Sequence, residues 1–464
     1  MSNKNTIHFE ISERKILLRV FDIVFVLLSL YLIGNVFDFD YFRITGENWT
    51  WTLVLVLYIT VFGTIFELYD LQKASKLEII ISNIVLTSSI TVLFYLLTPF
   101  FTPTLPDNRL QIIYFYLAFV ISLTVWRWAY VTFISSPRFY KKVLLVGEIS
   151  NIEPIAKSLK ESDPNYKIIG FINCEDEYGE KIKFKGLKEY KPQDFVQIIK
   201  SQKVSEIVVA SYNSETITPE IYNDLITLLE KGFTIREYTQ VYEELNYRVP
   251  VQFVGKDFYK YFPFSRSNQN KLYLLYRRIS DIVFSIFGLI IGIILLPIIL
   301  IGNLIGNKGP LFYKQERIGK NGSPFSIIKL RTMIKNAERD GMKWAQKNDA
   351  RVTKFGKFLR RARIDEIPQF FNVLKGEMSL IGPRPERPFF VQELSQIIPF
   401  YETRHIVKPG LTGWAQVNSR YGSTIDDSLI KLQYDLYYIK HRSLFLDLNI
   451  VIKTLSTIIF FRGQ

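Results

Sequence analysis

The most regular feature of the chain is a series of long apolar runs in its first third. A helix needs about 20 apolar residues to cross the hydrocarbon core of a bilayer. Four runs reach that length: Ile16–Phe37, Thr50–Leu71, Leu77–Phe100 and Leu110–Ile134. Strand-like alternation is absent, and an open sheet would leave backbone groups unsatisfied in lipid. We therefore predict a four-helix transmembrane bundle within residues 1–138, after an N-terminal tail.

Basic residues flank these runs unequally. The loops at 38–47 and 98–109 contain one Arg each, whereas the N-terminal side and the segment after the fourth run are rich in Lys and Arg. The positive-inside rule then puts both ends of the bundle in the cytoplasm. Arg127, inside the fourth run, is expected to snorkel to the inner interface. No cleavable signal peptide is expected, because the first run is too long and no small-residue cleavage site follows it.

Residues 139–255 change from long apolar runs to shorter alternating segments. Expected strands are 142–147, 168–172, 206–210 and 233–238, with helices at 151–160 and 219–231. This alternation predicts a parallel, Rossmann-like α/β module. Only Gly147 of the glycine-rich phosphate fingerprint is present, since Glu148, Ile149 and Ser150 follow it. A structural or regulatory module and a dinucleotide-binding one both remain open.

A fifth apolar run, Ile279–Ile305, follows a linker expected at 256–271 and opens a domain expected at 272–464. Pro297 should break a helix there. Both flanks are basic, so both should face the cytoplasm. We predict a re-entrant helix at 279–305 that enters the inner leaflet, bends at Pro297 and returns. A conventional span is the alternative, and it would place the rest of the chain outside.

Net charge also distinguishes the last domain from the rest of the chain. The formal charge is +14, and residues 271–464 hold 30 Lys and Arg against 15 Asp and Glu, so the whole excess lies there. Such a surface fits nucleic acid, anionic lipid or phosphorylated substrates. The single Cys174 excludes an intrachain disulfide, and the three histidines are far apart. A catalytic group should therefore be a carboxylate.

The basic residues converge on one acidic pair. Six of them lie between Arg351 and Arg363, directly before Asp365-Glu366, and Arg351, Lys354 and Arg361 would share one side of a helix. Asp365 could simply cap a helix that ends at Gly376. A carboxylate among arginines would also stay ionised and could attack phosphorus or hold Mg²⁺. Both interpretations are open on this pattern alone.

Two further segments could bind phosphate. Gly382-Pro383-Arg384-Pro385 fixes an arginine in a rigid turn, and Lys329-Leu330-Arg331-Thr332 ends a strand expected at 324–330. Taken singly, each could equally be an ordinary surface loop. The tail 434–461 mixes apolar and basic residues, and could lie on the membrane or form a core helix.

Taken in order, these motifs resemble the bacterial sugar transferases that act on polyprenyl phosphate, also called phosphoglycosyl transferases. The resemblance covers about residues 272–464, and the bundle plus module resembles the large, multidomain branch. The segments that carry it are 309–319, 329–333, 351–356, 365–369, 376–386 and 408–414. Ile367 stands where many relatives have Leu, a conservative departure.

The resemblance implies an activity. Such enzymes transfer a hexose-1-phosphate from a UDP-sugar to undecaprenyl phosphate and release UMP, with Mg²⁺ and a covalent intermediate on an Asp. Here Asp365 would be the nucleophile, and Glu366 would help to hold Mg²⁺ and position the substrate. The phosphate-binding residues it implies are Lys329, Arg331, Arg360 and Arg384, and Pro297 matches the break in the re-entrant helix.

The expected protein is thus a multi-pass enzyme of the bacterial cytoplasmic (inner) membrane, with a cytoplasmic catalytic domain, that starts exopolysaccharide, capsule or O-antigen synthesis. Its fold class is a four-helix transmembrane bundle, a Rossmann-like α/β module and an α/β catalytic domain with a re-entrant helix. Its partners would be a UDP-sugar, undecaprenyl phosphate and the bilayer, with no nucleic acid; a homodimer is left open. The alternatives are a membrane-anchored regulator that only binds sugar nucleotides, and a transporter, which the scarcity of ionisable residues in the spans disfavours.

Overall fold

The computed structural model describes residues 11–37, 39, 41–74, 77–134, 140–162, 166–174, 187–210, 217–251, 270–334, 337, 349–419 and 424–459. The chain forms two compact units, Met1–Val241 and Tyr242–Gln464. The expected module end at residue 255 differs from this division, because Val249 and Val251 lie in the apolar core of the second unit. The linker expected at 256–271 falls outside the described residues, apart from its last two.

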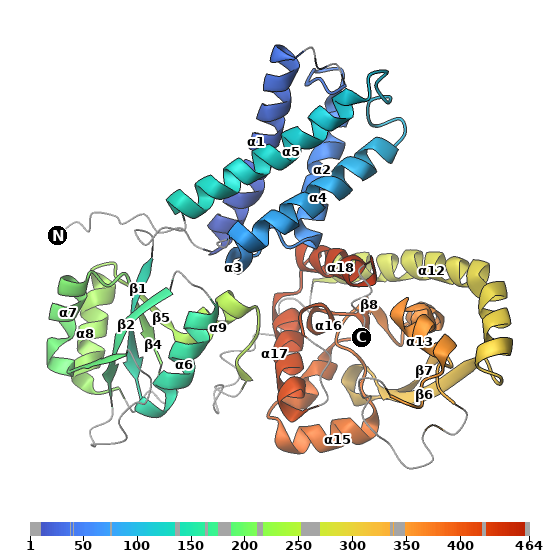
Figure 1. Cartoon of the computed structure of the whole chain (residues 1–464). Helices are drawn as coiled ribbons and strands as arrows, with labels where there is room; N and C mark the ends of the chain where they lie inside the picture. The colour runs from blue at the N-terminus through green and yellow to red at the C-terminus, as the bar shows by residue number, and fades with distance from the viewer. Residues whose placement is uncertain are drawn as a thin grey trace. The chain divides into compact units, whose positions relative to one another are not determined.

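Long helices make up the first part of unit one (Figure 1). They are α1 (Ile11–Val36), α2 (Trp49–Ile65), the short α3 (Leu71–Ala74), α4 (Leu77–Leu97) and α5 (Leu110–Ala129), which continues as a π-helical turn, η1 (Tyr130–Ile134). By length and composition α1, α4 and α5 could cross a membrane. The second expected run was too long: α2 has 17 residues, because Glu67 adopts a left-handed conformation and turns the chain towards α3.

An ion pair lies inside this bundle. Arg127 on α5 donates to Oδ2 of Asp22 on α1 over 2.8 Å and to the Leu68 carbonyl over 3.2 Å, and both charged side chains are fully buried. The expectation that Arg127 snorkels was therefore wrong. Pairing with Asp22 satisfies the charge within the bundle instead.

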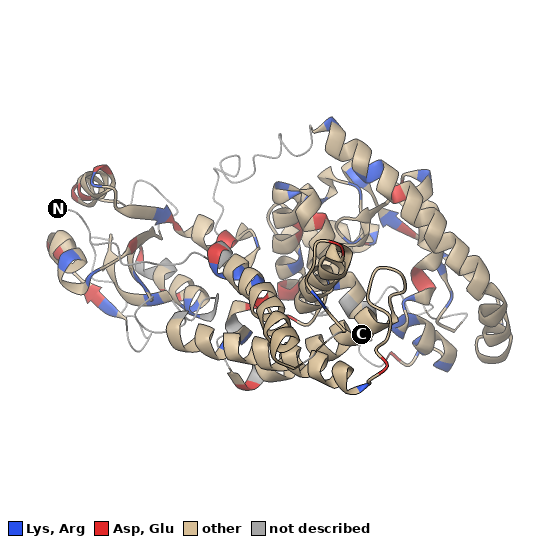
Figure 2. Cartoon of the chain, turned by 90° about the horizontal axis from the view of Figure 1, so that it is seen from above, with Lys and Arg blue, Asp and Glu red and all other residues tan. Residues whose placement is uncertain are grey.

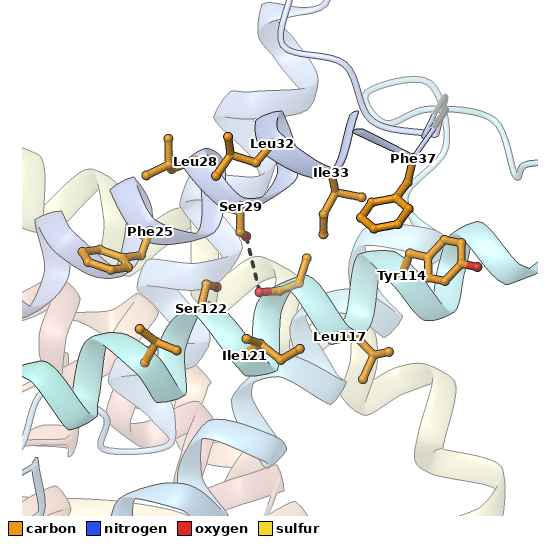
Figure 3. Close-up of a pocket in the computed structure, with 12 residues that line it drawn as sticks. Phe25, Leu28, Ser29, Leu32, Ile33, Phe37, Tyr114, Leu117, Ile121 and Ser122 are labelled. Atoms are coloured by element: carbon orange, nitrogen blue, oxygen red, sulfur yellow. Dashed lines mark hydrogen bonds between the residues drawn. The ribbon is translucent and has the colours of Figure 1, made fainter. Parts of the chain in front are cut away.

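An apolar groove runs between α1 and α5. Figure 3 shows its lining, which includes Phe25, Leu28, Leu32, Leu117 and Ile121, and the weak hydrogen bond from Ser29 Oγ to the Ala118 carbonyl at 3.4 Å. None of the residues that line it is an Asp, Glu, Lys, Arg or His. This groove therefore lacks the groups that phosphate chemistry requires.

The rest of unit one is a doubly wound parallel sheet in the order β3-β2-β1-β4-β5. Its elements are β1 (Lys141–Gly147), α6 (Ile149–Ser162), β2 (Tyr166–Asn173), β3 (Lys188–Tyr190), η3 (Pro192–Asp194), α7 (Phe195–Gln202), β4 (Glu206–Val209), α8 (Pro219–Glu230) and β5 (Thr234–Glu237). The next helix, α9 (Tyr238–Asn246), begins in unit one and ends in unit two. Figure 1 shows α7 and α8 on one face of the sheet and α6 on the other. Each strand and helix expected there is present; β3, η3, α7 and α9 were not predicted.

The longest helix described in unit two is α12 (Lys271–Gly306), which contains Pro297. A hairpin of β6 (Phe312–Ile318) and β7 (Pro324–Leu330) follows, with the turn η6 (Lys320–Gly322) between them. Next come α13 (Lys354–Arg361), η7 (Ile364–Gln369), α14 (Phe370–Lys375), β8 (Ser379–Ile381), α15 (Pro388–Ile397), η8 (Tyr401–Ile406), β9 (Gly410–Thr412), α16 (Trp414–Asn418), α17 (Ile425–His441) and α18 (Leu444–Ile459). The expected strand at 324–330 is β7.

Both ends of α12 are bound to the same domain. Near its start, Arg278 donates to the Val373 and Leu374 carbonyls of α14 over 2.9 and 2.7 Å. Just beyond its end, Asn307 donates to the Arg331 carbonyl over 2.6 Å. Figure 1 shows the helix changing direction towards its C-terminal end. Proline has no N–H to donate to the preceding turn, which favours a bend.

The tail consists of two helices with different surroundings. The α17 helix buries Leu432, Leu436 and Ile439 in the domain core. The α18 helix buries Leu446 and Ile450 there, while its other face leaves five large apolar side chains exposed: Leu444, Phe445, Leu448, Val451 and Leu455. Both helices thus contribute to the core, and the membrane-surface alternative stays a prediction for the exposed apolar face of α18.

Candidate active site

Asp365 and Glu366 lie in the turn η7, directly after α13. Thr353 caps α13 by accepting a hydrogen bond from the Gly356 N–H at 2.9 Å, so the helix begins at Lys354 and Arg351 lies outside it. Arg363 then adopts a left-handed conformation with φ 57°, which ends α13 and starts η7. Asp365 sits inside η7 and makes no capping hydrogen bond. The cap interpretation of Asp365 is therefore wrong, and its carboxylate is left for another role.

Glu366 is surrounded by cations from three different segments. Its Oε1 accepts from Arg384 Nη2 at 2.9 Å and from Lys329 Nζ at 3.5 Å, and its Oε2 accepts from Arg363 Nη1 at 3.3 Å. Asp365 and Glu366 are only 8% and 9% exposed. Within the described part of the chain, no side chain or backbone group donates to Asp365. One carboxylate is thus neutralised by the protein and its neighbour is not.

The two carboxylates consequently differ in acidity. Burial opposes ionisation of Glu366, but Arg384, Lys329 and Arg363 outweigh it and hold the pKa of Glu366 well below its usual range. Burial, together with the adjacent Glu366 charge, raises the pKa of Asp365 to about 6. At neutral pH Asp365 is still mainly ionised, and its raised pKa makes it the more nucleophilic of the two.

Lys329 reaches the pair from the end of β7. Asn372 on α14 fixes this strand beside η7, accepting from the Ile328 N–H at 3.2 Å and donating to the Ser326 carbonyl at 2.8 Å. Burial lowers the pKa of Lys329 to about 8, although Glu366 opposes that shift. Lys329 is therefore mainly protonated at neutral pH and carries its charge in a poorly solvated position.

Arg384 is held in place through its backbone. The fully buried Arg404 donates to the Arg384 carbonyl over 3.1 Å and to Asp435 over 2.7 Å, and Arg317 donates to the Pro385 carbonyl over 3.0 Å. The chain at Gly413 passes so close to the Gly382 carbonyl that a Cβ there would overlap it. The predicted rigid turn is thus braced from several sides.

The other two predicted basic residues lie elsewhere. Arg331 is buried and donates to the carbonyls of Asn307, Pro310 and Met333 over 2.7 to 2.8 Å. Arg360 donates to Thr332 Oγ1 over 2.9 Å and is close enough to favour the ionised form of Asp365. Neither donates to Glu366. Arg331 braces the segment after α12, and its hydrogen bonds give no support for phosphate binding.

Three residues of this site have roles that the sequence did not predict: Arg363, Arg404 and Gln416. Arg363 stood in the basic run before Asp365, but only its left-handed backbone directs it back to Glu366. Arg404 and Gln416 approach Arg384 from η8 and α16, and their side chains meet it only through the fold. No sequence spacing signals those two contacts.

Figure 2 shows that charged residues lie mostly outside the apolar stretches of the long helices.

Whether Mg²⁺ fits this site depends on which carboxylate oxygens are available to bind it. Mg²⁺ is commonly held by one or two carboxylates together with substrate phosphates. The described residues contain no group of three or more His, Cys, Asp and Glu side chains that could hold a metal alone. Asp365 offers unengaged oxygens, whereas both Glu366 oxygens already accept from cations. The pair fits Mg²⁺ only as a site that substrate oxygens complete.

Part of the chain is similar to known proteins. A family model described as bacterial sugar transferase matches residues 272–461. A UDP-N-acetylgalactosamine-undecaprenyl-phosphate N-acetylgalactosaminephosphotransferase from Aeromonas hydrophila is 54% identical over 153 residues, 33% of this chain and 36% of the relative. A UDP-glucose:undecaprenyl-phosphate glucose-1-phosphate transferase from Klebsiella pneumoniae is 41% identical over 41% of this chain and 42% of the relative.

A protein from Caulobacter vibrioides with the same name as the Klebsiella relative is 38% identical over 190 residues, 40% of this chain and 70% of the relative. The matched part of the chain thus spans well under half of the Aeromonas and Klebsiella proteins and most of the Caulobacter one.

Proposed function

Because this chain belongs to the bacterial sugar transferase family, we propose that it transfers a sugar phosphate from a UDP-sugar to undecaprenyl phosphate. The observation that carries the proposal is the unequal carboxylate pair. Glu366 is neutralised by three cations, while the adjacent Asp365 is buried, ionisable and without a hydrogen-bond donor among the described residues. That arrangement suits a nucleophile beside a binding site for anions.

The reaction has two steps that share one phosphorus. A carboxylate oxygen of Asp365 attacks the sugar-bearing phosphorus, the bond from that phosphorus to the bridging oxygen breaks, and UMP leaves with the bond's electron pair. An oxygen of undecaprenyl phosphate then attacks the same phosphorus. The bond to Asp365 breaks, its carboxylate is restored, and undecaprenyl-diphosphate-sugar leaves.

The basic side chains supply what phosphoryl transfer mainly needs, which is positioning and charge neutralisation. Lys329, Arg363 and Arg384 would hold phosphate oxygens beside Asp365 while keeping Glu366 ionised. When bound, Mg²⁺ would add charge neutralisation at the leaving phosphate, held by Asp365, Glu366 and substrate oxygens. Glu366 would also orient the three cations, so that they point at one position.

The membrane topology is part of the proposal. A helix whose two ends both hydrogen-bond to one α/β domain has no simple way to place those ends on opposite sides of a bilayer. This supports a re-entrant α12 bent at Pro297, with the catalytic domain on the cytoplasmic face of the bacterial inner membrane. The exposed apolar faces of α12 and α18 would enter or rest on the inner leaflet.

A direct assay tests this function. Membranes that contain the protein are incubated with undecaprenyl phosphate and a panel of UDP-sugars, and both UMP and labelled lipid are measured. The names of the relatives differ in the sugar, so UDP-N-acetylgalactosamine and UDP-glucose are the first sugar nucleotides to test. Release of UMP coupled to lipid labelling is expected with at least one. If no sugar nucleotide gives either product, the proposed function is wrong.

A further inference from the structure

Gln416 lies next to the proposed active site and the proposed mechanism does not use it. It belongs to α16, and its Oε1 accepts a hydrogen bond from Arg384 Nη1 at 3.0 Å. The other terminal nitrogen of the same guanidinium donates to Glu366 Oε1 at 2.9 Å. One arginine therefore connects Gln416 to the carboxylate pair.

Chemistry fixes which way the Gln416 amide points. A guanidinium can only donate hydrogen bonds, so the amide oxygen must face Arg384. The amide nitrogen then faces away from Arg384 with two N–H donors. This nitrogen is buried and has no hydrogen-bond partner in the part of the chain that the structure describes. The amide cannot be flipped to relieve this without turning its N–H groups towards Arg384.

A loose helix could tolerate such a group, but α16 is held firmly. Trp414 donates through Nε1 to the Tyr247 carbonyl over 3.1 Å and stacks on Tyr437. Asn418 donates to the Trp414 carbonyl over 2.9 Å and accepts from Lys453 over 2.7 Å. Gln416 is thus presented by a fixed element, so its unpaired nitrogen is a feature of the folded domain.

A buried donor without a partner destabilises the free protein, and a substrate acceptor would recover that free energy on binding. We propose that Gln416 is a substrate-contact residue whose Nε2 donates a hydrogen bond to an oxygen of the sugar-phosphate group being transferred, while its Oε1 holds Arg384. This inference rests on the proposed function. A phosphate oxygen and a sugar hydroxyl share the same acceptor chemistry.

The test separates the donor role of Gln416 from its role towards Arg384. Gln416→Glu keeps an oxygen that accepts from Arg384 and removes the N–H donors, whereas Gln416→Leu removes both. Full-length protein is assayed for UMP release and for the rise in apparent melting temperature caused by UDP-sugar. Gln396→Glu, on the exposed side of α15, makes the same charge change away from the site.

We expect Gln416→Glu to lower kcat/KM by on the order of 10–100-fold, the effect of losing a hydrogen bond to a charged group. The rise in melting temperature with UDP-sugar should shrink, while the melting temperature without ligand stays at or above that of the wild type. Equal losses across the UDP-sugars would assign the contact to a phosphate oxygen, and a loss concentrated on one sugar would assign it to a hydroxyl.

Wild-type kcat/KM and a wild-type ligand response in Gln416→Glu would overturn the inference and leave Gln416 as a positioning residue for Arg384. A wild-type protein that turns over no UDP-sugar would instead refute the proposed function, so the two failures are distinguishable. Gln396→Glu should match the wild type in both measurements.

Discussion

Arg384 donates through Nη2 to Oε1 of Glu366 over 2.9 Å, although the two residues lie on different segments of the second unit. This ion pair also determines the electrostatic surroundings of Asp365, the residue next to Glu366. Because Arg384, Lys329 and Arg363 all face Glu366, the protein compensates one charge of an adjacent pair and leaves Asp365 exposed to the repulsion of the other. Asp365 is thus the carboxylate of the pair whose charge the fold leaves uncompensated.

Replacing Asp365 should remove activity and stabilise the fold. Its pKa is raised by burial and by Glu366, so the folded state binds its proton more tightly than the unfolded state does. Its contribution to stability is therefore lost as pH rises through about 6. Asp365→Asn should abolish UMP release, and at pH 7.5 should raise the free energy of unfolding by roughly 1–3 kcal/mol.

Thermal melting in detergent checks this prediction. The advantage of Asp365→Asn over the wild type should shrink at pH 5, where the wild-type carboxyl is mainly protonated. A variant that melts well below the wild type at pH 7.5 would show that Asp365 has a structural role.

The rate of UMP release should have two limbs in its pH dependence. Asp365 must be ionised to attack, so the acid limb should lie near pH 6, and Lys329 must be protonated to hold phosphate, so the alkaline limb should lie near pH 8. Lys329→Arg keeps a positive charge at high pH. Its alkaline limb should disappear even if its maximum rate falls, and an unchanged alkaline limb would assign that limb to another group.

Arg331 should matter for stability rather than for substrate binding. Its guanidinium donates to three backbone carbonyls, so Arg331→Met leaves buried acceptors unpaired at about 1–3 kcal/mol each. The melting temperature should fall by several degrees. The KM for UDP-sugar, measured on the folded fraction, should stay near the wild-type value. A large rise in KM without loss of stability would restore the phosphate-binding role expected from the sequence.

The two flanks of α12 should be accessible from the same side of the membrane. Cys174 is the chain's one cysteine and is buried, so Cys174→Ser provides a background for labelling. Single cysteines at Lys271 and Lys314, both exposed, lie on either side of the apolar stretch. Impermeant maleimide should label both only after the cytoplasmic face is opened. Labelling of the two positions from opposite sides would establish a conventional span.

Local sequence patterns were sufficient to predict most helices and strands, but not the side-chain contacts between them. Hydrophobic periodicity located the apolar helices and the parallel sheet, and the short β3 escaped because three residues carry too little pattern. The buried partner of Arg127 is Asp22, 105 residues away, and no spacing rule connects them. Likewise Arg331 and Arg384 look equivalent as basic residues near turns. Only the fold turns one towards backbone carbonyls and the other towards Glu366.

A single-turnover experiment decides whether Asp365 carries the sugar phosphate between the two substrates. Purified protein is mixed with UDP-sugar in the absence of undecaprenyl phosphate, and UMP release and the mass of the peptide that contains Asp365 are followed. We predict one UMP per active site and a sugar-phosphate adduct on that peptide, discharged when undecaprenyl phosphate is added. Steady turnover with both substrates but no adduct and no UMP burst would show that Asp365 forms no covalent intermediate.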